Sequence, residues 1–585
     1  MLLMNCCKVF ALTGCLAASA VAKPAIHQEE VGSPPSLQEP WWKHAVIYEI
    51  YPRSFQDSNA NGIGDLNGIR QRLGYLETLG VDAIWIAPIF PSPQVDFGYD
   101  VSDYENIDPQ YGTLTDFDRL LAEAKIRNIR ILLDMVLNHT SEKHGWFVES
   151  ASSRTNPKHD WYVWNDGARG AGGKMVPPNN WVSLFGGSAW EWVPAVKQFY
   201  YHEFYRQQPD LNWRNPAVEE AMFDAMRFWL NRGVAGFRLD AIPSLFEDAK
   251  LRDEPSLGGV NAQGDPKLKR IYTDNLPEVH DTIRRLRSMV SEYPGDRVLV
   301  GETYLPNTRE LDRWYGGPRH DELQLPMDML VGFTNKLDAA TFRKRLSEVY
   351  AQVHGSQPLL VFDNHDNQRS WDRYGDGIHN DDIAKIIATL LLTSKATALV
   401  YQGQELGQRT DTPTRIEDVK DPIGISGWPK ERGRDGERTP MQWDASNVQA
   451  GFSTNPRTWL PVSSNYATIN VKSEFADPKS LLNWYKRLIA MRRTVPALQS
   501  GSVVMLQKKN SNVLSYARIA RDGRAIVIAL NMSGKPQNIS LDLKANRVRG
   551  TIVHTLMENP DTLSKAQSTL GVRLLPFAAW IATVD

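Results

Sequence analysis

The sequence alternates short apolar segments with amphipathic helical patterns over most of its length. The apolar segments are rich in Val, Ile and Leu, which is typical of buried parallel strands. The segments between them place apolar residues at spacings of three and four, as amphipathic helices do. Strands are predicted over 46–50, 83–87, 129–134, 236–240, 298–302, 359–363 and 397–401, with an eighth near 327–331. Helices are predicted over 69–79, 116–127, 218–231, 279–290, 342–353, 383–392 and 481–493.

Such an alternation, sustained over hundreds of residues, folds either as a closed eight-stranded barrel or as an open doubly wound sheet. The dinucleotide-binding form of the open sheet carries a Gly-x-Gly-x-x-Gly segment after its first strand. This chain has no such segment there. The sequence therefore favours an α/β fold of the (β/α)8 TIM barrel type.

Two segments depart from the alternating pattern and predict further domains. Residues 139–212, after the third strand, are rich in Trp, Gly, Asn and Pro and are far longer than an ordinary loop, so we predict a small inserted domain B. After residue 500 the apolar segments are short and alternating, which is typical of an antiparallel β-sandwich. The predicted organisation is a barrel formed by 41–138 and 213–500, the insert 139–212, and a C-terminal β domain over 501–585.

The N-terminus has the pattern of a secretory signal peptide over residues 1–22, with a weakly basic start, an apolar run and small residues before Lys23. Residues 23–40 contain four prolines and are predicted to form an extended leader. No stretch reaches the roughly 20 apolar residues of a transmembrane helix, and the C-terminus lacks the hydrophobic tail of a glycolipid anchor. We expect a secreted, extracellular protein without a lipid anchor.

Composition excludes several classes of function. The formal net charge of −2 provides no basic surface for nucleic acid. All three cysteines lie in the predicted signal peptide, so neither cysteine catalysis nor cysteine-ligated zinc is expected in the mature chain. Asn531 and Asn538 begin Asn-x-Ser segments and are predicted glycosylation acceptors, whereas Asn138 matches the same pattern inside the expected active site and is discounted.

Polar side chains recur at the ends of four predicted strands. A single Asp at such a place commonly caps a helix or a loop, but its repetition on four strands predicts an active site, because the carboxyl ends of barrel strands share one face. The set holds carboxylates, His and Arg, without a Ser in a nucleophile elbow. Cleavage of a glycosidic bond needs one carboxylate at the anomeric carbon and one carboxylic acid at the leaving oxygen, which this set can supply.

The same segments resemble the conserved regions of glycoside hydrolase family 13, the α-amylase family, and within it the α-glucosidase, oligo-1,6-glucosidase and insect maltase group. Residues 208–212 and 438–443 are similar to segments typical of that group. The resemblance extends from about residue 41 to the C-terminus. The four conserved regions match 134–139, 236–241, 301–303 and 362–366, in the order of the family.

The resemblance implies the roles of three carboxylates: Asp240 as nucleophile, Glu302 as acid/base, and Asp366 as the group that stabilises the transition state. Arg238 lies two residues before Asp240 and thus on the same face of the strand, where it is expected to help to keep Asp240 ionised. Glu302 has to retain its proton near neutral pH, which requires a raised pKa.

The resemblance also implies contacts with the sugar. His139 and His365 would hydrogen-bond the sugar at the cleavage point, and Asp96 and Tyr99 would close that subsite, with Tyr99 stacked on the ring. Arg438 would pair with Asp96 and close the non-reducing end, which makes a pocket and implies exo action. A surface or interdomain ion pair is the alternative for Arg438. The aromatic loop 181–190 is expected either to line the leaving-group subsites or to pack within the insert.

A loop before the first long helix has the composition of a cation site. Asp57, Asn59, Asn61 and Asp65 place oxygen ligands at positions one, three, five and nine, and Ile63 offers a carbonyl at position seven, as at the start of an EF-hand. The twelfth position is glycine, so a true EF-hand is not expected. The resemblance implies a structural Ca²⁺, with an empty Asn- and Gly-rich turn as the alternative. No organic cofactor is expected.

Ala241, which follows the predicted nucleophile, is typical of maltase-type members, whereas Val is typical of isomaltase-type ones. The predicted function is a secreted, exo-acting, retaining α-glucosidase that releases terminal α-1,4-linked glucose from maltose, sucrose and short oligosaccharides by double displacement. The alternatives are an isomaltase-type or transglycosylating relative, a non-catalytic relative such as the heavy subunits of amino-acid transporters, and a competent enzyme that also serves as a binding receptor. Small di- and oligosaccharides are the expected partners, and no protein ligand can be named.

Overall fold

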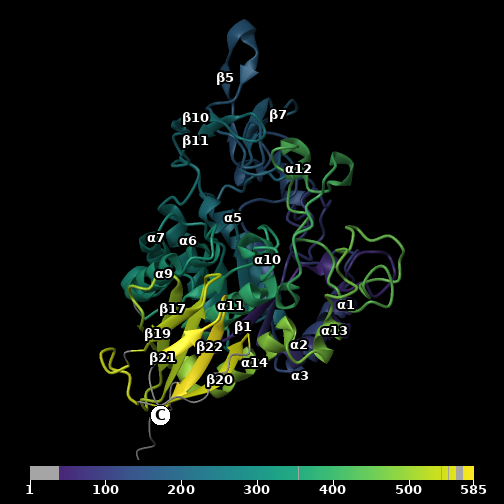
Figure 1. Cartoon of the computed structure of the whole chain (residues 1–585). Helices are drawn as coiled ribbons and strands as arrows, with labels where there is room; N and C mark the ends of the chain where they lie inside the picture. The colour runs from purple at the N-terminus through teal and green to yellow at the C-terminus, as the bar shows by residue number, and fades with distance from the viewer. Residues whose placement is uncertain (1–38, 354, 542, 551, 561–570) are drawn as a thin grey trace, which may run out of the picture. The chain divides into compact units, whose positions relative to one another are not determined.

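The barrel is closed by eight parallel strands in the order β1-β15-β14-β13-β12-β9-β3-β2. The computed structural model describes residues 39–585 except 354, 542, 551 and 561–570, so the predicted signal peptide and nearly all of the leader lie outside the described residues. The TIM barrel prediction is confirmed (Figure 1). The strands are β1 Val46–Ile50, β2 Ala83–Ile86, β3 Arg130–Val136, β9 Gly236–Asp240, β12 Val298–Gly301, β13 Leu325–Asp328, β14 Leu359–Val361 and β15 Thr397–Tyr401.

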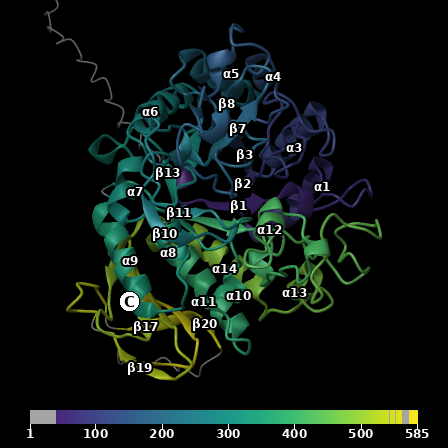
Figure 2. The same cartoon turned by 90° about the horizontal axis from the view of Figure 1, so that it is seen from above.

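Figure 2 shows helices α3, α5, α6 and α9 arranged around the strands. Their ends follow local capping rules: α5 begins after Asn215, whose side chain accepts from the Ala217 N–H, and ends at Gly233, whose φ of 106° favours glycine. The longer helices are α2 Leu73–Leu79, α3 Leu114–Ile126, α5 Pro216–Arg232, α6 Glu278–Ser291, α7 Thr308–Trp314, α9 Ala339–Gln352, α11 Asn380–Thr393 and α14 Leu481–Thr494. The shorter ones are α1 Leu66–Gln71, α4 Gly145–Ser150, α8 Met329–Gly332, α10 Ser370–Tyr374, α12 Pro422–Gly427, α13 Val471–Ala476 and α15 Pro496–Ser500.

Two predicted elements differ from the structure. The helix predicted over 69–79 is divided into α1 and α2 at Arg72, whose φ of −99° and ψ of 5° are not helical. The eighth strand, predicted near 327–331, is β13 and ends at Asp328. The reason is that the Asp328 side chain accepts from the N–H groups of Leu330 and Val331 and thereby starts helix α8.

The segment after β3 contains its own small sheets. Strands β4 Trp164–Asn165, β8 Gln198–Tyr201 and β7 Trp190–Val193 form an antiparallel sheet, and β5 Ala168–Arg169 pairs with β6 Met175–Val176. Trp190 of β7 and Tyr201 of β8 form a local core with Trp181. A further hairpin, β10 Ser256–Val260 with β11 Pro266–Leu268, follows β9 and was not expected from the sequence.

The C-terminal domain has two antiparallel sheets, as predicted. The larger has the order β16-β17-β18-β22-β20, and the smaller pairs β19 with β21. Val527 of the larger sheet and Val572 of the smaller belong to one buried core, which is the arrangement of a sandwich. The strands are β16 Ser502–Met505, β17 Val513–Ile519, β18 Ala525–Asn531, β19 Gln537–Ser540, β20 Val553–Asn559, β21 Gly571–Leu574 and β22 Ala579–Val584.

One predicted glycosylation acceptor is wrong. Asn531 ends β18 with a fully buried side chain, and its amide donates to the carbonyls of Lys535 and Leu575 at 2.8 and 2.6 Å, so a glycan has no access to it. Asn538 is exposed on β19 and stays a predicted acceptor. Within the described part of the chain, no helix is long and apolar enough to cross a membrane.

Candidate active site

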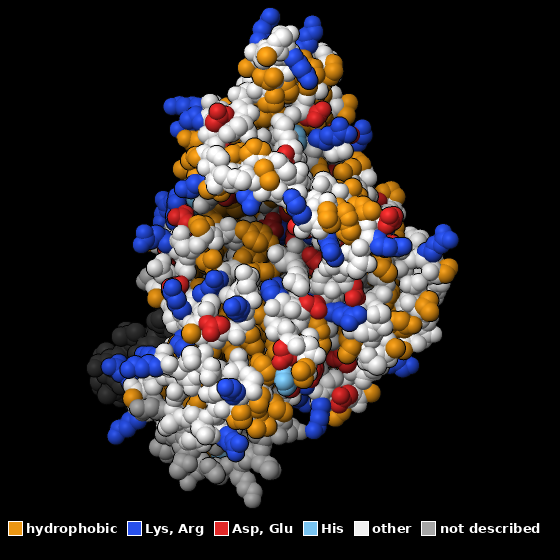
Figure 3. All heavy atoms as spheres, turned by 45° about the horizontal axis from the view of Figure 1, so that its top comes forward, with side chains coloured by type: hydrophobic (Ala, Val, Ile, Leu, Met, Phe, Trp, Pro, Cys, Tyr) orange, Lys and Arg blue, Asp and Glu red, His pale blue; other side chains and the backbone are white. Residues whose placement is uncertain are grey.

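The predicted carboxylates meet at one end of the barrel. Asp240 is the last residue of β9, Glu302 directly follows β12, and Asp366 lies in the loop after β14. Figure 3 shows a hollow in the surface with acidic side chains inside it. The cavity that contains these carboxylates has a volume of about 230 Å³, below the ~300–1,000 Å³ typical of drug-sized ligand sites, which suits a single sugar ring. It is lined by Asp96, Tyr99, His139, Phe185, Phe204, Asp240, Ala241, Glu302, Tyr304, Asp366, Ile423 and Arg434.

Arg238 lies beneath the cavity and contacts three carboxylates. Its Nη1 is 2.6 Å from Asp240 Oδ1 and 2.9 Å from Asp134 Oδ1, and its Nη2 is 2.9 Å from Glu302 Oε1. Parallel pairing of β3 with β9 places Asp134 opposite Arg238, so the contact follows from the strand register. Because the guanidinium is only 1% exposed, its charge acts on these carboxylates with little screening.

Burial controls the protonation of Asp240 and Glu302, the two carboxyl groups predicted to react. It raises the pKa of Asp240 to about 7 and the pKa of Glu302 to about 7, while Arg238 opposes both shifts. Two coupled groups of this kind share about one proton near neutral pH. Asp240 makes the shorter contact with Arg238, at 2.6 Å against 2.9 Å for Glu302, so the guanidinium stabilises the carboxylate form of Asp240 more strongly. We therefore place the charge on Asp240 and the proton on Glu302.

Asp366 has the opposite electrostatic environment. Although burial disfavours its charge, His365, Arg434 and Arg438 together hold the pKa of Asp366 well below its usual range. Arg434 Nη1 and Arg438 Nη2 lie 3.0 and 2.8 Å from the same oxygen, Oδ1. Asp366 is therefore the permanently charged member of the three carboxylates.

The predicted pairing of Arg438 with Asp96 is wrong. Arg434 makes this contact, with its Nη2 2.9 Å from Asp96 Oδ1. Arg438 is fully buried and donates from Nε to the His365 carbonyl at 2.8 Å, which also excludes a surface ion pair. Arg434, and not Arg438, reaches Asp96 because Asp421 holds it in place. Asp421 caps α12, and its Oδ2 lies 2.8 Å from Nε of Arg434. Arg434 lies four residues before the segment 438–443, so the resemblance did not include it.

The predicted sugar contacts surround the reacting carboxylates. Tyr99 and His139 line the cavity with Asp96, whereas Arg238, His365 and Arg438 lie behind the lining. The Tyr99 ring stacks on the His365 ring, with centroids 5.4 Å apart and planes at 12°. Burial lowers the pKa of His139 to about 3, so its imidazole is neutral and can both donate and accept.

The structure adds residues in the lining, and Gln208 behind it, that the sequence pattern missed. Gln208 lies in a segment noted for its resemblance, and its Nε2 donates to Asp96 Oδ2 at 3.2 Å. Of the aromatic loop, Phe185 lines the cavity, while Trp181 and Trp190 pack within the insert. Tyr304 could have been found from the sequence, because it lies two residues after Glu302, and side chains two residues apart in an extended chain lie on the same side. Phe204 and Ile423 come from distant segments that only the fold brings together.

The predicted cation loop is closed by its own hydrogen bonds. Asp57 Oδ2 accepts from the Gly62 N–H at 2.8 Å, and Asp65 Oδ1 accepts from the Gly68 N–H at 2.7 Å. The side-chain oxygens of Asn59 and Asn61 accept from the N–H groups of Asn61 and Ile63. No group of three or more His, Cys, Asp or Glu suited to a metal occurs among the described residues. The carboxylate and amide oxygens are of the kinds that calcium binds, so calcium stays a prediction.

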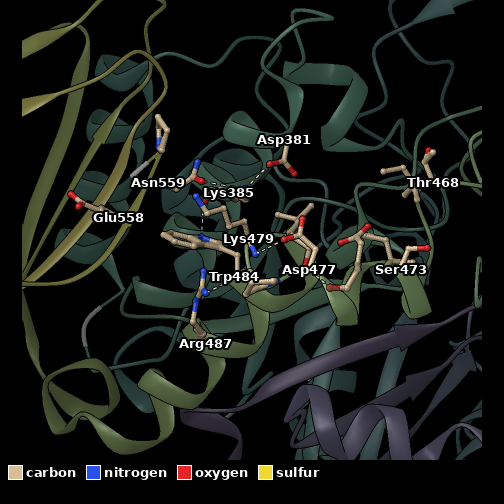
Figure 4. Close-up of a pocket in the computed structure, with 17 residues that line it drawn as sticks. Asp381, Lys385, Thr468, Ser473, Asp477, Lys479, Trp484, Arg487, Glu558 and Asn559 are labelled. Atoms are coloured by element: carbon tan, nitrogen blue, oxygen red, sulfur yellow. Dashed lines mark hydrogen bonds and ion pairs between the residues drawn. The ribbon is translucent and has the colours of Figure 1, made fainter. Parts of the chain in front are cut away.

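A larger cavity, of about 620 Å³, lies among α11, α13, α14 and β20 (Figure 4). It contains none of the predicted site residues. Lys385 on its wall pairs with Asp381 at 2.5 Å and donates to Asn559 Oδ1 at 3.2 Å. The Trp484 ring is buried and donates from Nε1 to Thr389, so it offers no open stacking face. Catalytic chemistry is therefore placed in the smaller cavity.

Comparisons with known proteins identify the family. Residues 49–501 match the family model described as alpha amylase, catalytic domain. The chain is 42% identical over 527 residues to a probable alpha-glucosidase of Rhizobium meliloti (strain 1021), covering 87% of this chain and 93% of the relative. It is 39% identical over 521 residues to maltase 1 of Drosophila virilis, covering 86% and 80%. The solved structure of the α-glucosyl transfer enzyme XgtA superimposes with a TM-score of 0.84 at 37% identity, covering 94% of this chain and all of that one.

The barrel, the buried carboxylates and these matches define the class: the chain belongs to the α-amylase family of glycoside hydrolases. Within that family it is an enzyme of the group that contains α-glucosidases, oligo-1,6-glucosidases and maltases, including insect maltases.

Proposed function

We propose that this protein is a secreted, exo-acting, retaining α-glucosidase of the maltase type. It removes the terminal glucose from the non-reducing end of maltose, sucrose and short α-1,4-linked oligosaccharides. The observation that carries the proposal is the pair Asp240 and Glu302, which share Arg238 at the wall of a cavity sized for one sugar ring. Secretion rests on the signal-peptide pattern of residues 1–22.

The proposed reaction is a double displacement. The Asp240 carboxylate attacks the anomeric carbon while Glu302 gives its proton to the glycosidic oxygen, so the leaving sugar departs as an alcohol. Glu302, now ionised, takes a proton from water, which attacks the anomeric carbon and releases Asp240. Two inversions at one carbon give α-glucose. Throughout, charged Asp366 stabilises the positive character of the oxocarbenium-like transition state.

Exo action is supported by the ion pair between Arg434 and Asp96, both of which line the cavity. This pair closes one end of the cavity, so a chain extended beyond the terminal glucose has no room there. A preference for α-1,4 linkages is supported by Ala241, whose small side chain lines the cavity beside Glu302.

The experiment that tests this proposal is proton NMR of the purified mature chain with maltose, sucrose and isomaltose. We expect glucose to appear first as the α-anomer, before mutarotation, and maltose to react faster than isomaltose. Initial β-glucose would overturn the retaining mechanism. Faster cleavage of isomaltose would overturn the maltase assignment, and no turnover of any of the three would overturn the proposed function.

Transfer of glucose to a second sugar is the other function that an observation favours, because the structural relative XgtA is described as an α-glucosyl transfer enzyme. Transfer uses the same two steps, with a sugar hydroxyl in place of water. At high maltose concentration, new anomeric signals from longer or relinked saccharides would establish transfer by this chain, whereas glucose alone would limit it to hydrolysis.

We also propose a structural calcium ion in the loop 57–65. Asp57, Asn59, Asn61 and Asp65 would supply side-chain oxygens and Ile63 its carbonyl, and the ion would hold the loop that precedes α1. We expect a chelator to lower the melting temperature by several degrees and added calcium to restore it. The Asp57→Asn variant should lose this response to chelator. An unchanged melting curve of the wild-type protein would contradict the proposal.

A further inference from the structure

Glu49 is a buried carboxyl group directly behind the active site. It lies in β1 and is fully buried, between Tyr401 of β15 and Trp85 of β2 in the barrel register. Its Oε1 is 2.6 Å from Nδ1 of His365. Its Oε2 has no hydrogen-bond partner among the described residues. The conserved segments recognised in the sequence do not include Glu49, and it does not line the cavity.

The hydrogen bonds of His365 determine which of its ring nitrogens carries the proton. Nε2 of His365 lies 2.7 Å from the hydroxyl oxygen of Tyr99, and that hydroxyl donates its single proton to Asp134 Oδ2 at 3.1 Å. With that proton given to Asp134, Tyr99 accepts from His365, which assigns the imidazole proton to Nε2. The same Nε2 is 3.4 Å from Asp366 Oδ2, where a proton is favourable and a lone pair is not.

This tautomer requires a donor at the other ring nitrogen. A neutral imidazole carries one N–H, so Nδ1 of His365 presents a lone pair to Glu49. A carboxylate would repel that lone pair at 2.6 Å, whereas a carboxylic acid donates to it. The hydrogen bonds thus place a proton on Glu49.

The charges around Glu49 agree with this assignment. Burial raises the pKa of Glu49 well above its ordinary range and lowers the pKa of His365 to about 3, so burial favours the neutral form of both side chains. The charged or titratable groups that face Glu49 are Arg238, which favours its ionised form, and Asp134, Asp366, His365 and Tyr401.

We propose that Glu49 is a positioning residue for the reaction: its carboxylic acid donates to Nδ1 of His365 and fixes the tautomer that presents Nε2–H to Tyr99, Asp366 and the cavity. The role rests on the proposed α-glucosidase reaction. Glu49 does not touch the sugar. It holds the imidazole that supports Asp366, the carboxylate expected to stabilise the transition state.

The experiment compares Glu49→Gln with Glu49→Leu. The Gln amide can donate to Nδ1 as the carboxylic acid does, whereas Leu has a similar size and no donor. We expect Glu49→Gln to keep kcat for maltose within about threefold of wild type. Glu49→Leu should lower kcat by about 10–100-fold with little change in KM, because the partner that orients the imidazole is lost. Equal kcat for the Gln and Leu variants would overturn the proposal.

Glu405 provides a matched control. It is another fully buried glutamate, hydrogen-bonded to Tyr48 and Tyr75 at 2.6 and 2.5 Å, and it contacts none of the site residues in these bonds. Glu405→Leu should destabilise the fold without the selective fall in kcat of the remaining folded enzyme. If it lowers kcat as much as Glu49→Leu does, the effect is structural and the positioning role is wrong.

The tautomer is measured independently of activity by imidazole ¹⁵N NMR of protein labelled at histidine, with the signal of His365 assigned by its loss in His365→Gln. Wild type and Glu49→Gln should carry the proton on Nε2, and a proton on Nδ1 of the wild-type protein would overturn the inference even if Glu49→Leu fails to fold. A wild-type enzyme without turnover would overturn the proposed function instead, while this tautomer measurement still decides the inference about Glu49.

Discussion

At the scale of single residues, Arg238 explains why two carboxyl groups in one cavity can take different roles. A buried cation beside three carboxylates lowers the energy of their ionised forms, but burial itself raises it, so Asp240 and Glu302 both titrate near neutral pH. The contact of 2.6 Å with Arg238 keeps the charge on Asp240. In the proposed reaction Asp240 attacks and Glu302 protonates, which is the division of roles that glycosidic cleavage needs.

Leaving-group dependence separates these two roles. Glu302→Gln removes the proposed general acid, so kcat for maltose should fall by about 10²–10⁴-fold. The loss should be much smaller for 4-nitrophenyl α-glucoside, whose leaving group departs without protonation. Asp240→Asn removes the nucleophile and should abolish the cleavage of both substrates. The measurement is steady-state kinetics on both substrates, with circular dichroism to establish that each variant is folded. An equal loss on both substrates in Glu302→Gln would contradict its role as acid.

The sequence predicted those residues whose chemistry is concentrated in short segments at strand ends. Asp240, Glu302 and Asp366 are of this kind. Arg434 was missed because its partner Asp96 lies 338 residues away, and nothing local distinguishes it from Arg438. Glu49 could not be found for a similar reason, since only closure of the barrel brings β1 to the loop after β14, 316 residues further along the chain.

At the scale of elements, the segment around α12 contributes Ile423 and Arg434 to the cavity lining although it lies outside the alternating strands and helices. Asp421 caps α12 and holds Arg434, which in turn contacts Asp96 in the loop after β2 and Asp366 in the loop after β14. One side chain thus joins three segments that are distant in sequence. Such a segment has no periodic pattern of its own, and for this reason its position could not be predicted, whereas periodic helices such as α5 were predicted to within two residues of their ends.

Removing this link should change which bonds the enzyme cleaves. Arg434→Ala leaves Asp96 without its partner, and truncating one member of a buried charge pair costs roughly 2–5 kcal/mol, so kcat/KM for maltose should fall by about 10²-fold or more. Opening the closed end should also allow release of maltose from maltotetraose, measured by chromatography of the products.

Arg415→Ala, which removes an exposed pair with Asp418 from the same region, is the control and should leave both properties unchanged. A variant Arg434→Ala with less than threefold loss and glucose as its only product would contradict the closing role.

At the scale of the whole molecule, the described chain is stabilised without a disulfide, since its cysteines all lie in the first 22 residues. Stability therefore rests on the large buried core, and this core also encloses carboxyl groups. Glu474, on α13 at the wall of the larger cavity, is 7% exposed, and its Oε1 has no hydrogen-bond partner among the described residues. Burial raises the pKa of Glu474 to about 8. The folded state must therefore bear the cost of an ionised, buried carboxylate at alkaline pH.

This cost has a defined sign and pH range. Because the pKa of Glu474 is higher in the folded state than the ordinary value near 4.5, the folded state binds the proton more tightly, and stability falls as pH rises from about 4.5 to about 8. Glu474→Gln does not titrate, and its amide oxygen can still accept from the Leu482 N–H. The variant should match wild type within about 1 kcal/mol at pH 4.5 and exceed its free energy of unfolding by on the order of 2 kcal/mol at pH 8.5, allowing for relaxation around the charge. Urea denaturation at the two pH values measures this difference.

Glu348→Gln, at an exposed position of α9, controls for the loss of one surface charge. A difference between Glu474→Gln and wild type that does not grow with pH would show that Glu474 ionises without cost, and that water reaches its carboxylate through the larger cavity.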